Sequence, residues 1–490
     1  MSAVYRGKMR FWGVLFFILV LAGGLRWYNL GEESLWSDEA YTAVFVEKHS
    51  LWEITSGQAD DRVNPPFFYM VESVWTRAFG AGESALRWPA AVFGWLTVVA
   101  AAAAAFVLSR RRGVALGAAF LTAVSWYGVE YSQEARSYSL LVLLAVVQLA
   151  IVVVLFDWRR FEQPARRSWR VWLAHVGLAV VTAVGVYTHF AFWSLLAAEG
   201  VWLLWLLVGR SSRGKRTYLF SAMAALVVGA ATFLYWFWVS TYPHLIRSKS
   251  SPFWQPALTW RSLSLFLQQA LWIPAWVDWV LALVFVLVLL AAAFGVLFRY
   301  VRKQQRAIVV LLLCVLIIPF VFFWAFDLWL DRYVLFVVPV LFIVVTWAVV
   351  MLSRRVSVPL ALVVFLAVSM SSAWWYRDYF REFQKEPWRQ LMGFVQQYDD
   401  GKGRIFVNKE FSKFPWEYYY QGDTKTKFPK KVEGDVAEWE KEMAQYPWVM
   451  VVYMQTNDRG RLLEQGAAGV FASRETWRQG EIEALYFNGK

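Results

Sequence analysis

The sequence predicts a polytopic α-helical membrane protein with about 11 transmembrane helices, followed by a small α/β domain. Its 490 residues are 59% hydrophobic and only 17% charged, whereas soluble domains average about 45–50% apolar and about 25% charged residues. Apolar runs of about 18 or more residues, long enough to cross a bilayer as helices, recur through most of the chain. After them, short strand-like and helix-like patterns alternate. We therefore expect a transmembrane domain over 1–376 and an α/β domain over 377–490.

Hydropathy places the individual spans. The first span follows the basic residues Arg6, Lys8 and Arg10, and no small-residue cleavage site comes after it. We therefore expect an uncleaved helix rather than a signal peptide. The shortest connection is the turn within 187–193. The predicted spans are 11–30, 86–108, 114–131, 137–156, 171–190, 191–209, 217–239, 277–298, 307–326, 333–352 and 356–376.

Basic residues predict the orientation of these spans. Alternate loops are rich in Lys and Arg, and the positive-inside rule puts them, with the N-terminus, in the cytoplasm. The first loop (31–85) and the C-terminal domain would then lie outside a cytoplasmic membrane. The net charge of +13 belongs to these short loops, so we expect membrane lipids and no nucleic acid as partners. The basic loops are 110–112, 157–170, 210–216, 299–306 and 353–355.

Local patterns predict the elements outside the membrane. In the first loop, apolar residues at helical intervals predict one amphipathic interfacial helix over 38–54, N-capped by Ser37 or Asp38. In the C-terminal domain, a pattern led by proline predicts a helix over 386–398. A second helix should end at Gly466. Short apolar runs rich in β-branched residues predict strands at 404–407 and 448–454, and the run 483–487 predicts a last strand.

Ionisable residues gather where the spans meet the predicted outer face. Paired carboxylates there suit general-base chemistry or a divalent cation, and guanidinium groups suit a phosphate leaving group. The stretch 401–406 lacks the spacing of a P-loop. A reaction outside the cell has no access to cytoplasmic nucleotides, so the donor should be lipid-linked. The gathered residues are Asp38, Glu39, Glu134, Arg136, His189, Arg332 and Tyr333.

Several of these residues lie in motifs that resemble a known family. "WSDEAYT", "NPPFFYMVESVWTRAFG", "YSQEARSYSLL", "YTHF" and "LDRYVLFVVPVL" are similar, in order along nearly the whole chain, to glycosyltransferase family 39. That group includes the protein O-mannosyltransferases and the lipid A aminoarabinose transferases of the GT-C superfamily. The resemblance implies an enzyme that moves a hexose or pentose from a polyprenyl-phosphate donor to a lipid, glycan or protein acceptor, with inversion at the anomeric carbon.

The resemblance also implies roles for individual residues. Asp38 matches the catalytic base of the first outside loop, and Glu39 is its neighbour in the motif. Asn64 stands where relatives often carry His or Lys. Family members differ over metal dependence. The implied donor-phosphate and substrate residues are Asn64, Arg136, His189, Arg332 and Tyr333, and a divalent metal ion would be held by Asp38, Glu134 and His189.

Two other classes of function compete with an enzyme. A transporter or flippase of lipid-linked sugars would show two similar halves and ionisable residues near the membrane midplane. An assembly factor would use the C-terminal domain to bind protein. The polar residues gather at one membrane face, and this favours the enzyme. The C-terminal domain would either contact the acceptor or act as a stabilising cap.

Overall fold

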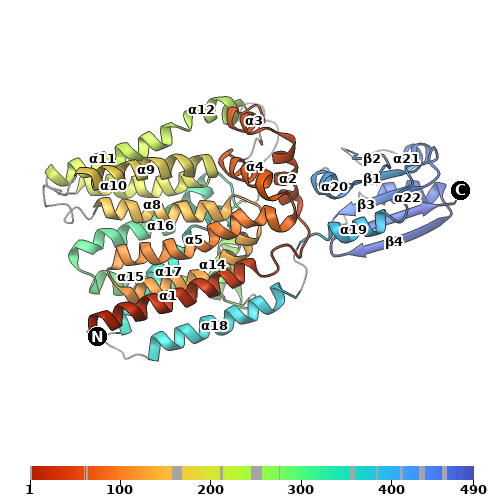
Figure 1. Ribbon diagram of the computed structural model, residues 1–490. Coiled ribbons are helices and arrows are strands. Elements are labelled where there is room, and N and C mark those ends of the chain that lie inside the picture. Colours follow the sequence, from red (N-terminus) through yellow and green to blue (C-terminus); the bar gives the residue numbers. More distant parts are fainter. Residues whose placement is uncertain are drawn as a thin grey trace. The chain divides into compact units, whose positions relative to one another are not determined.

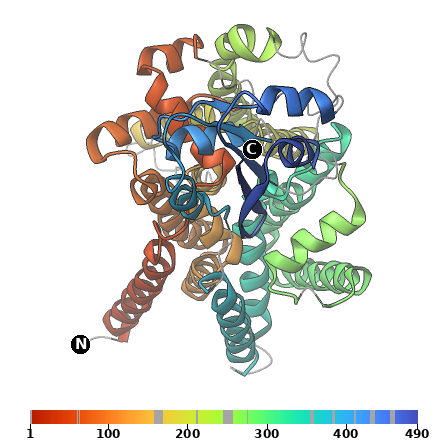
Figure 2. The ribbon, with the colours of Figure 1, turned by 90° about the vertical axis from the view of Figure 1, so that its right-hand side faces the viewer.

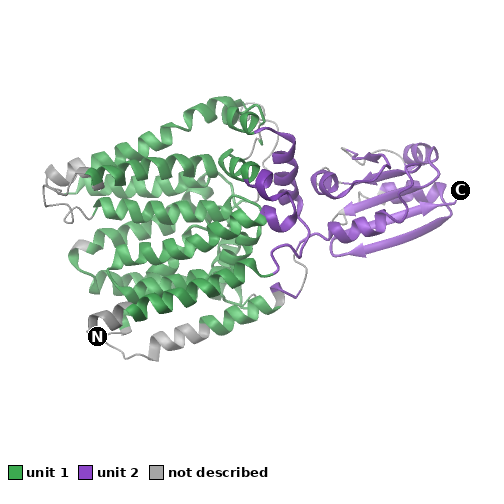
Figure 3. Cartoon of the chain, viewed as in Figure 1, with its two compact units in different colours: residues 1–28, 51–74, 87–378 green, residues 29–50, 75–86, 379–490 purple. Residues whose placement is uncertain are grey.

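The computed structural model divides into two compact units, each described here by itself (Figures 1 and 3). Unit 1 comprises residues 1–28, 51–74 and 87–378, and unit 2 comprises residues 29–50, 75–86 and 379–490. Two parts of the first loop therefore group with the C-terminal domain. The described residues are 3–59, 61, 64–156, 168–209, 213–243, 257–274, 276–353, 359–381, 385–408, 412–429, 436–454 and 461–489.

Unit 1 is a bundle of long apolar helices, seen side-on in Figure 1 and end-on in Figure 2. Among the described residues, seven stretches are long and apolar enough to cross a membrane. They lie in α1 (Ala3–Trp27), α5 (Glu83–Ser109), α8 (Tyr138–Phe156), α9 (Ser168–Thr188), the run of α11 (Arg213–Ala231), α12 (Leu234–Trp236) and η4 (Phe237–Thr241), α15 (Trp279–Tyr300) and α16 (Arg306–Ala325).

The predicted third span, 114–131, is a bent pair of helices. Helix α6 (Arg112–Ala123) and the continuation α7 (Trp126–Glu130) with η1 (Tyr131–Gln133) meet at 65°. Ser125 is the N-cap of α7, and its hydroxyl accepts a hydrogen bond from the Gly128 N–H at 3.2 Å. The buried Arg26 guanidinium donates to the carbonyls of Thr122 (3.1 Å) and Ala123 (3.0 Å). These bonds satisfy backbone groups that the break would otherwise leave unpaired in hydrocarbon.

The remaining helices of unit 1 complete the bundle. α10 (Phe192–Val208) and α17 (Val337–Ser353) lie on predicted spans, but their apolar stretches are shorter than those of the seven. The tight turn expected within 187–193 lies between α9 and α10. The number of eleven spans stays a prediction. The other elements are α3 (Leu51–Ser56), α4 (Phe67–Phe79), α14 (Trp260–Ala270), η6 (Lys303–Gln305), η7 (Asp331–Val334) and α18 (Pro359–Tyr379).

Unit 2 contains a five-stranded sheet of order β2-β1-β3-β5-β4. β1 pairs in parallel with β2 and β3, whereas β5 is antiparallel to β3 and β4. Its strands are β1 (Arg404–Val407), β2 (Thr426–Lys427), β3 (Val449–Met454), β4 (Ser473–Gln479) and β5 (Ile482–Asn488), and its helices are α2 (Ser37–Lys48), α19 (Trp388–Val395), α20 (Lys413–Tyr419), α21 (Val436–Met443) and α22 (Arg461–Val470).

Helices cover both faces of this sheet. Successive side chains of a strand point to opposite faces, so Met450 packs with α19 and α20 while Val451 packs with α21 and α22. The predicted helix at 386–398 and the strands at 404–407, 448–454 and 483–487 are confirmed. Helix α22, however, continues past Gly466 to Val470. The polar strand β4 escaped prediction because its side chains are mostly exposed and it lies at the sheet edge.

The interfacial helix expected over 38–54 is two helices, α2 and α3. They are separated at His49, whose backbone is extended (φ −121°, ψ 139°). The N-cap of α2 is Trp36, and neither Ser37 nor Asp38 caps the helix. The Glu39 carboxylate accepts the Trp36 N–H at 3.4 Å and so turns back onto the start of its own helix.

Candidate functional site

In unit 2, the residues expected to be catalytic lie in the first turn of α2. Asp38 is half-buried, whereas Glu39 is fully buried. The Lys385 ammonium lies 3.1 Å from the Glu39 carboxylate, and both side chains are nearly inaccessible to solvent. A buried carboxylate is tolerated when a partner compensates its charge. Glu39 is therefore held as an ion pair, and Asp38 is the more accessible acid of the two.

The next residue of the C-terminal segment, Glu386, reaches the same turn of α2. The Ser37 hydroxyl lies 3.3 Å from Glu386 Oε2, and the Trp388 indole N–H donates to the same oxygen at 2.6 Å. Burial and the nearby Asp38 carboxylate raise the pKa of Glu386 to about 7, against the opposing effect of the hydrogen bonds from Trp388 and Ser37. Near neutral pH this carboxyl group is therefore partly protonated.

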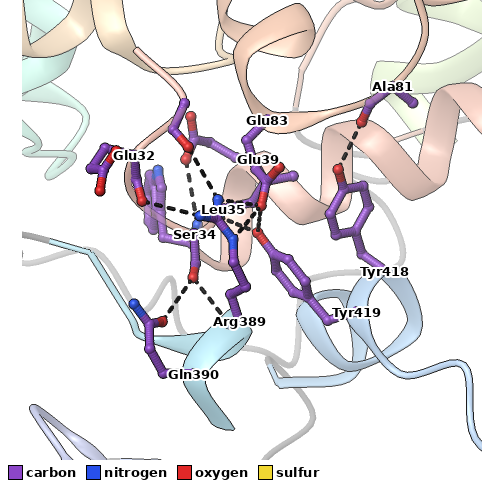
Figure 4. Close-up of polar contacts among 12 residues, drawn as sticks. Glu32, Ser34, Leu35, Glu39, Ala81, Glu83, Arg389, Gln390, Tyr418 and Tyr419 are labelled. Carbon is purple, nitrogen blue, oxygen red and sulfur yellow. Dashed lines mark hydrogen bonds and ion pairs between the residues drawn. The ribbon is translucent and has the colours of Figure 1, made fainter. Parts of the chain in front are cut away.

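A second set of contacts within unit 2 ties the first loop to α19 and α20 (Figure 4). The Arg389 guanidinium donates to Glu83 at 2.7 Å and to the Gly31 carbonyl at 3.1 Å. The Tyr419 hydroxyl accepts the buried Leu35 N–H at 2.7 Å and donates to Glu83 at 3.0 Å. These bonds link segments that lie more than 300 residues apart in the chain.

In unit 1, the "NPP" motif belongs to a hydrogen-bonded group around Asp61. Its carboxylate accepts hydrogen bonds from the Asn64 side chain and the Tyr69 hydroxyl, both at 2.7 Å. Arg136, which is buried, lies 3.3 Å from the same hydroxyl. Asn64 and Arg136 are thus connected through Asp61 and Tyr69.

The buried His189 lies between two tyrosines and near two guanidinium groups. Its ring is 5.5 Å from that of Tyr138 and 5.1 Å from that of Tyr333, and Arg332 lies over Tyr138 at 5.6 Å. Burial, and then the charges of Arg136 and Arg332, lower the pKa of His189 to about 3. The imidazole is therefore neutral at physiological pH, and its Nδ1 accepts the Ala191 N–H at 3.0 Å.

The structure thus brings together most of the predicted residues within two separate groups. Asp38 and Glu39 belong to unit 2, whereas unit 1 holds Asn64, Glu134, Arg136, His189, Arg332 and Tyr333. Among the residues described, no group of three or more His, Cys, Asp or Glu side chains could hold a metal ion. The metal set of Asp38, Glu134 and His189 is divided between the units and stays a prediction.

Some site residues escaped the sequence analysis. Lys385 and Glu386 contact the first turn of α2, although more than 340 residues separate them in the chain. The only signal for them in the sequence is a charged pair directly before Pro387. Asp61 lies three residues before Asn64 of the "NPP" motif. In the middle of α10, the buried Glu199 accepts a hydrogen bond from Gln148 at 2.7 Å, and Gln148 accepts one from Thr182 at 2.9 Å. A lone glutamate in an apolar run was the available signal for that group.

No family model matches the sequence, and no curated protein matches it. Several solved structures do share its fold. ArnT from Cupriavidus metallidurans in the apo state has a TM-score of 0.60 and 14% identity, and the match covers 99% of this chain and 98% of that one. The same protein bound to undecaprenyl phosphate gives 0.57 and 14%, over 97% and 98% of the two chains.

The oligosaccharyltransferase AglB from Archaeoglobus fulgidus, in complex with an inhibitory peptide and a dolichol-phosphate, is a further structural match. Its TM-score is 0.58 with 11% identity, and the match covers 91% of this chain and 69% of that chain. At such identities the comparison concerns the fold. Together with the seven apolar stretches of the described residues, these matches confirm the predicted fold class: the chain shares the multi-span helical membrane fold of ArnT and AglB.

Proposed function

We propose that this protein is an integral-membrane glycosyltransferase that moves a hexose or pentose from a polyprenyl-phosphate donor to a lipid, glycan or protein acceptor at the extracytoplasmic face. The observation that carries the proposal is the pair of guanidinium groups, Arg136 and Arg332, around the neutral His189. A lipid phosphate is the anion that such a pair suits in a membrane protein. The similar structures of ArnT with undecaprenyl phosphate and AglB with dolichol-phosphate support this choice.

The cationic residues of unit 1 would bind the donor and stabilise its leaving group. When the bond between the anomeric carbon and the phosphate oxygen breaks, negative charge grows on the phosphate. Fixed cations aimed at that charge lower the barrier. Because His189 is neutral, the two arginines supply the positive charge while the imidazole and Tyr333 form a wall of the site. Asn64 would hydrogen-bond the sugar.

In unit 2, Asp38 would act as the general base. It would accept the proton of the acceptor hydroxyl or amine while the acceptor oxygen or nitrogen forms the new bond to the anomeric carbon, with inversion. Glu39 is compensated by Lys385, so we assign it the positioning of the first turn of α2. A structure of similar fold was solved in complex with zinc. The described residues offer no group of ligands that fits a metal ion, so the proposed reaction is written with protein side chains alone.

Binding of the carrier lipid by the purified full-length protein tests the phosphate site. In a titration with undecaprenyl phosphate, Arg136→Gln and Arg332→Gln should each weaken binding by about 10- to 100-fold, since a hydrogen bond to a charged group contributes about 1.5–3 kcal/mol. Arg302→Gln, which alters an exposed arginine in another loop, serves as the matched control and should bind as the wild type does. Equal binding by all four proteins would refute the assignment.

One observation favours the alternative function, transport of a lipid-linked sugar. Glu199 is a buried ionisable residue in the middle of an apolar helix, with Gln148 as its partner, and such residues often mark transport pathways. A transporter should lose function in Glu199→Gln and keep it in Asp38→Asn. A glycosyltransferase should show the opposite pattern, because the Gln148 hydrogen bond survives in Glu199→Gln.

A further inference from the structure

Unit 1 has an apolar groove between α1, α6 and α17, away from the residues assigned to the reaction. Its volume is about 460 Å³. Two glycines of α6, Gly113 and Gly117, line it where α17 approaches α6 closely, since a Cβ at Gly117 would lie 2.8 Å from the Thr346 side chain. The lining of the groove includes Val14 and Phe17 of α1, Leu116 of α6 and Val349 of α17.

The groove lies at the edge of the bundle. Figure 2 shows α1 at the periphery of unit 1, and only 28% of the apolar stretch of this helix is buried. Phe17 is 72% exposed although it lines the groove. Hydrocarbon chains of the surrounding bilayer therefore have access to this space.

Two arginines border one end of the groove. Arg112 directly precedes Gly113, and its guanidinium lies over the ring of Phe11 at 5.8 Å. Arg10 is four residues before Val14, so the two share one face of α1. Both arginine side chains are exposed. An apolar groove that ends at two exposed guanidinium groups matches a molecule with a hydrocarbon tail and an anionic head.

We propose that this groove is a binding site for an anionic phospholipid, with one acyl chain along α6 and the phosphate between Arg10 and Arg112. The acyl chain supplies fit rather than selectivity, since it leaves an equally apolar bilayer when it enters the groove. Selectivity comes from the arginines, and basic pockets between transmembrane helices are known to bind anionic head groups. The occupant is a structural lipid distinct from the glycosyl donor, so the site does not depend on the proposed reaction.

Native mass spectrometry of the full-length protein in detergent tests this site. The probes are phosphatidylglycerol and phosphatidylcholine with identical acyl chains. A contribution of about 1 kcal/mol for each arginine near a head group predicts that the wild type prefers phosphatidylglycerol by about thirty-fold. The double variant R10Q/R112Q should lose this preference, and the control Arg302→Gln should keep it. A wild type that binds both lipids equally, or a double variant that keeps the preference, would overturn the proposal.

The groove itself is tested by filling it. Leu116→Trp should reduce the binding of both lipids, and Val349→Phe provides a second filler should the first variant fold poorly. Unchanged lipid binding in a folded filler variant would count against the groove. Complete displacement of phosphatidylglycerol from the wild type by equimolar undecaprenyl phosphate would assign the groove to the carrier lipid and overturn our choice of occupant.

Discussion

Glu386 offers a quantitative test of the contact between the C-terminal segment and α2. Its carboxyl group receives hydrogen bonds from Ser37 and Trp388 and has a pKa of about 7, raised by burial and by Asp38. We consider Glu386→Gln, because the amide copies the neutral acid and its oxygen still accepts both hydrogen bonds. The substitution removes only the charge that appears above pH 7.

The magnitude follows from the shift in pKa. The value rises from 4.5 to about 7, and 1.36 kcal/mol per pKa unit gives at most about 3 kcal/mol. Between these values the folded state binds the proton more tightly than the unfolded state. The stabilisation is therefore complete below pH 4.5 and is lost as the pH rises through about 7. Wild type and variant should be equally stable at pH 4.5, and the variant should be more stable at pH 8.

Hydrogen–deuterium exchange of α19, corrected for the intrinsic pH dependence of exchange, measures this difference. The protection of residues 388–395 in the wild type relative to Glu386→Gln should fall by up to about 200-fold between pH 4.5 and pH 8. Glu481→Gln, at the turn between β4 and β5, is the control and should follow the wild type. A protection ratio that stays constant over this range would refute the buried, protonated state of Glu386.

Three further substitutions test separate parts of the account. Arg26→Met should destabilise unit 1 by about 2–4 kcal/mol, since buried carbonyls at the bend of α6 and α7 lose their donors. Thermal unfolding in detergent measures this loss of stability, and an unchanged unfolding midpoint would contradict it. Lys385→Met should destabilise unit 2 by about 3–5 kcal/mol, because it leaves the buried charge of Glu39 without its cation. The double variant with Glu39→Gln should recover most of this stability, as measured by hydrogen–deuterium exchange. Tyr419→Phe should cost about 1–3 kcal/mol because the Leu35 N–H loses its acceptor; unaltered exchange at Leu35 would exclude this.

Helices and strands whose pattern lies in neighbouring residues could be predicted from the sequence. Apolar runs identified the helices of unit 1, and short apolar runs identified β1, β3 and β5, because length and period determine which elements can be buried. The bend at 124–125 was not predicted, since the apolar run continues through it. The Arg26 guanidinium stabilises the bend, and its acceptors lie 96 and 97 residues away in the chain.

The candidate site was predicted residue by residue but not as an arrangement. Asp38 and Glu39 form one motif, yet the ion pair with Lys385 gives them different environments. No local spacing encodes a contact across 346 residues. Likewise, the aromatic walls around His189 come from separate helices, so the low pKa of its imidazole follows from packing and not from the "YTHF" motif.

The most direct test of the central claim is the transfer of sugar by cells that carry Asp38→Asn. Mass spectrometry of cell-envelope glycans, lipids and glycoproteins would compare the wild type, Asp38→Asn and the control Glu32→Gln, each at equal levels in the membrane. Glu32 is an exposed acid of the same segment. A general base at Asp38 predicts that one glycosylated product disappears in Asp38→Asn and persists in Glu32→Gln. Full transfer by a normally inserted Asp38→Asn protein would contradict the proposed function.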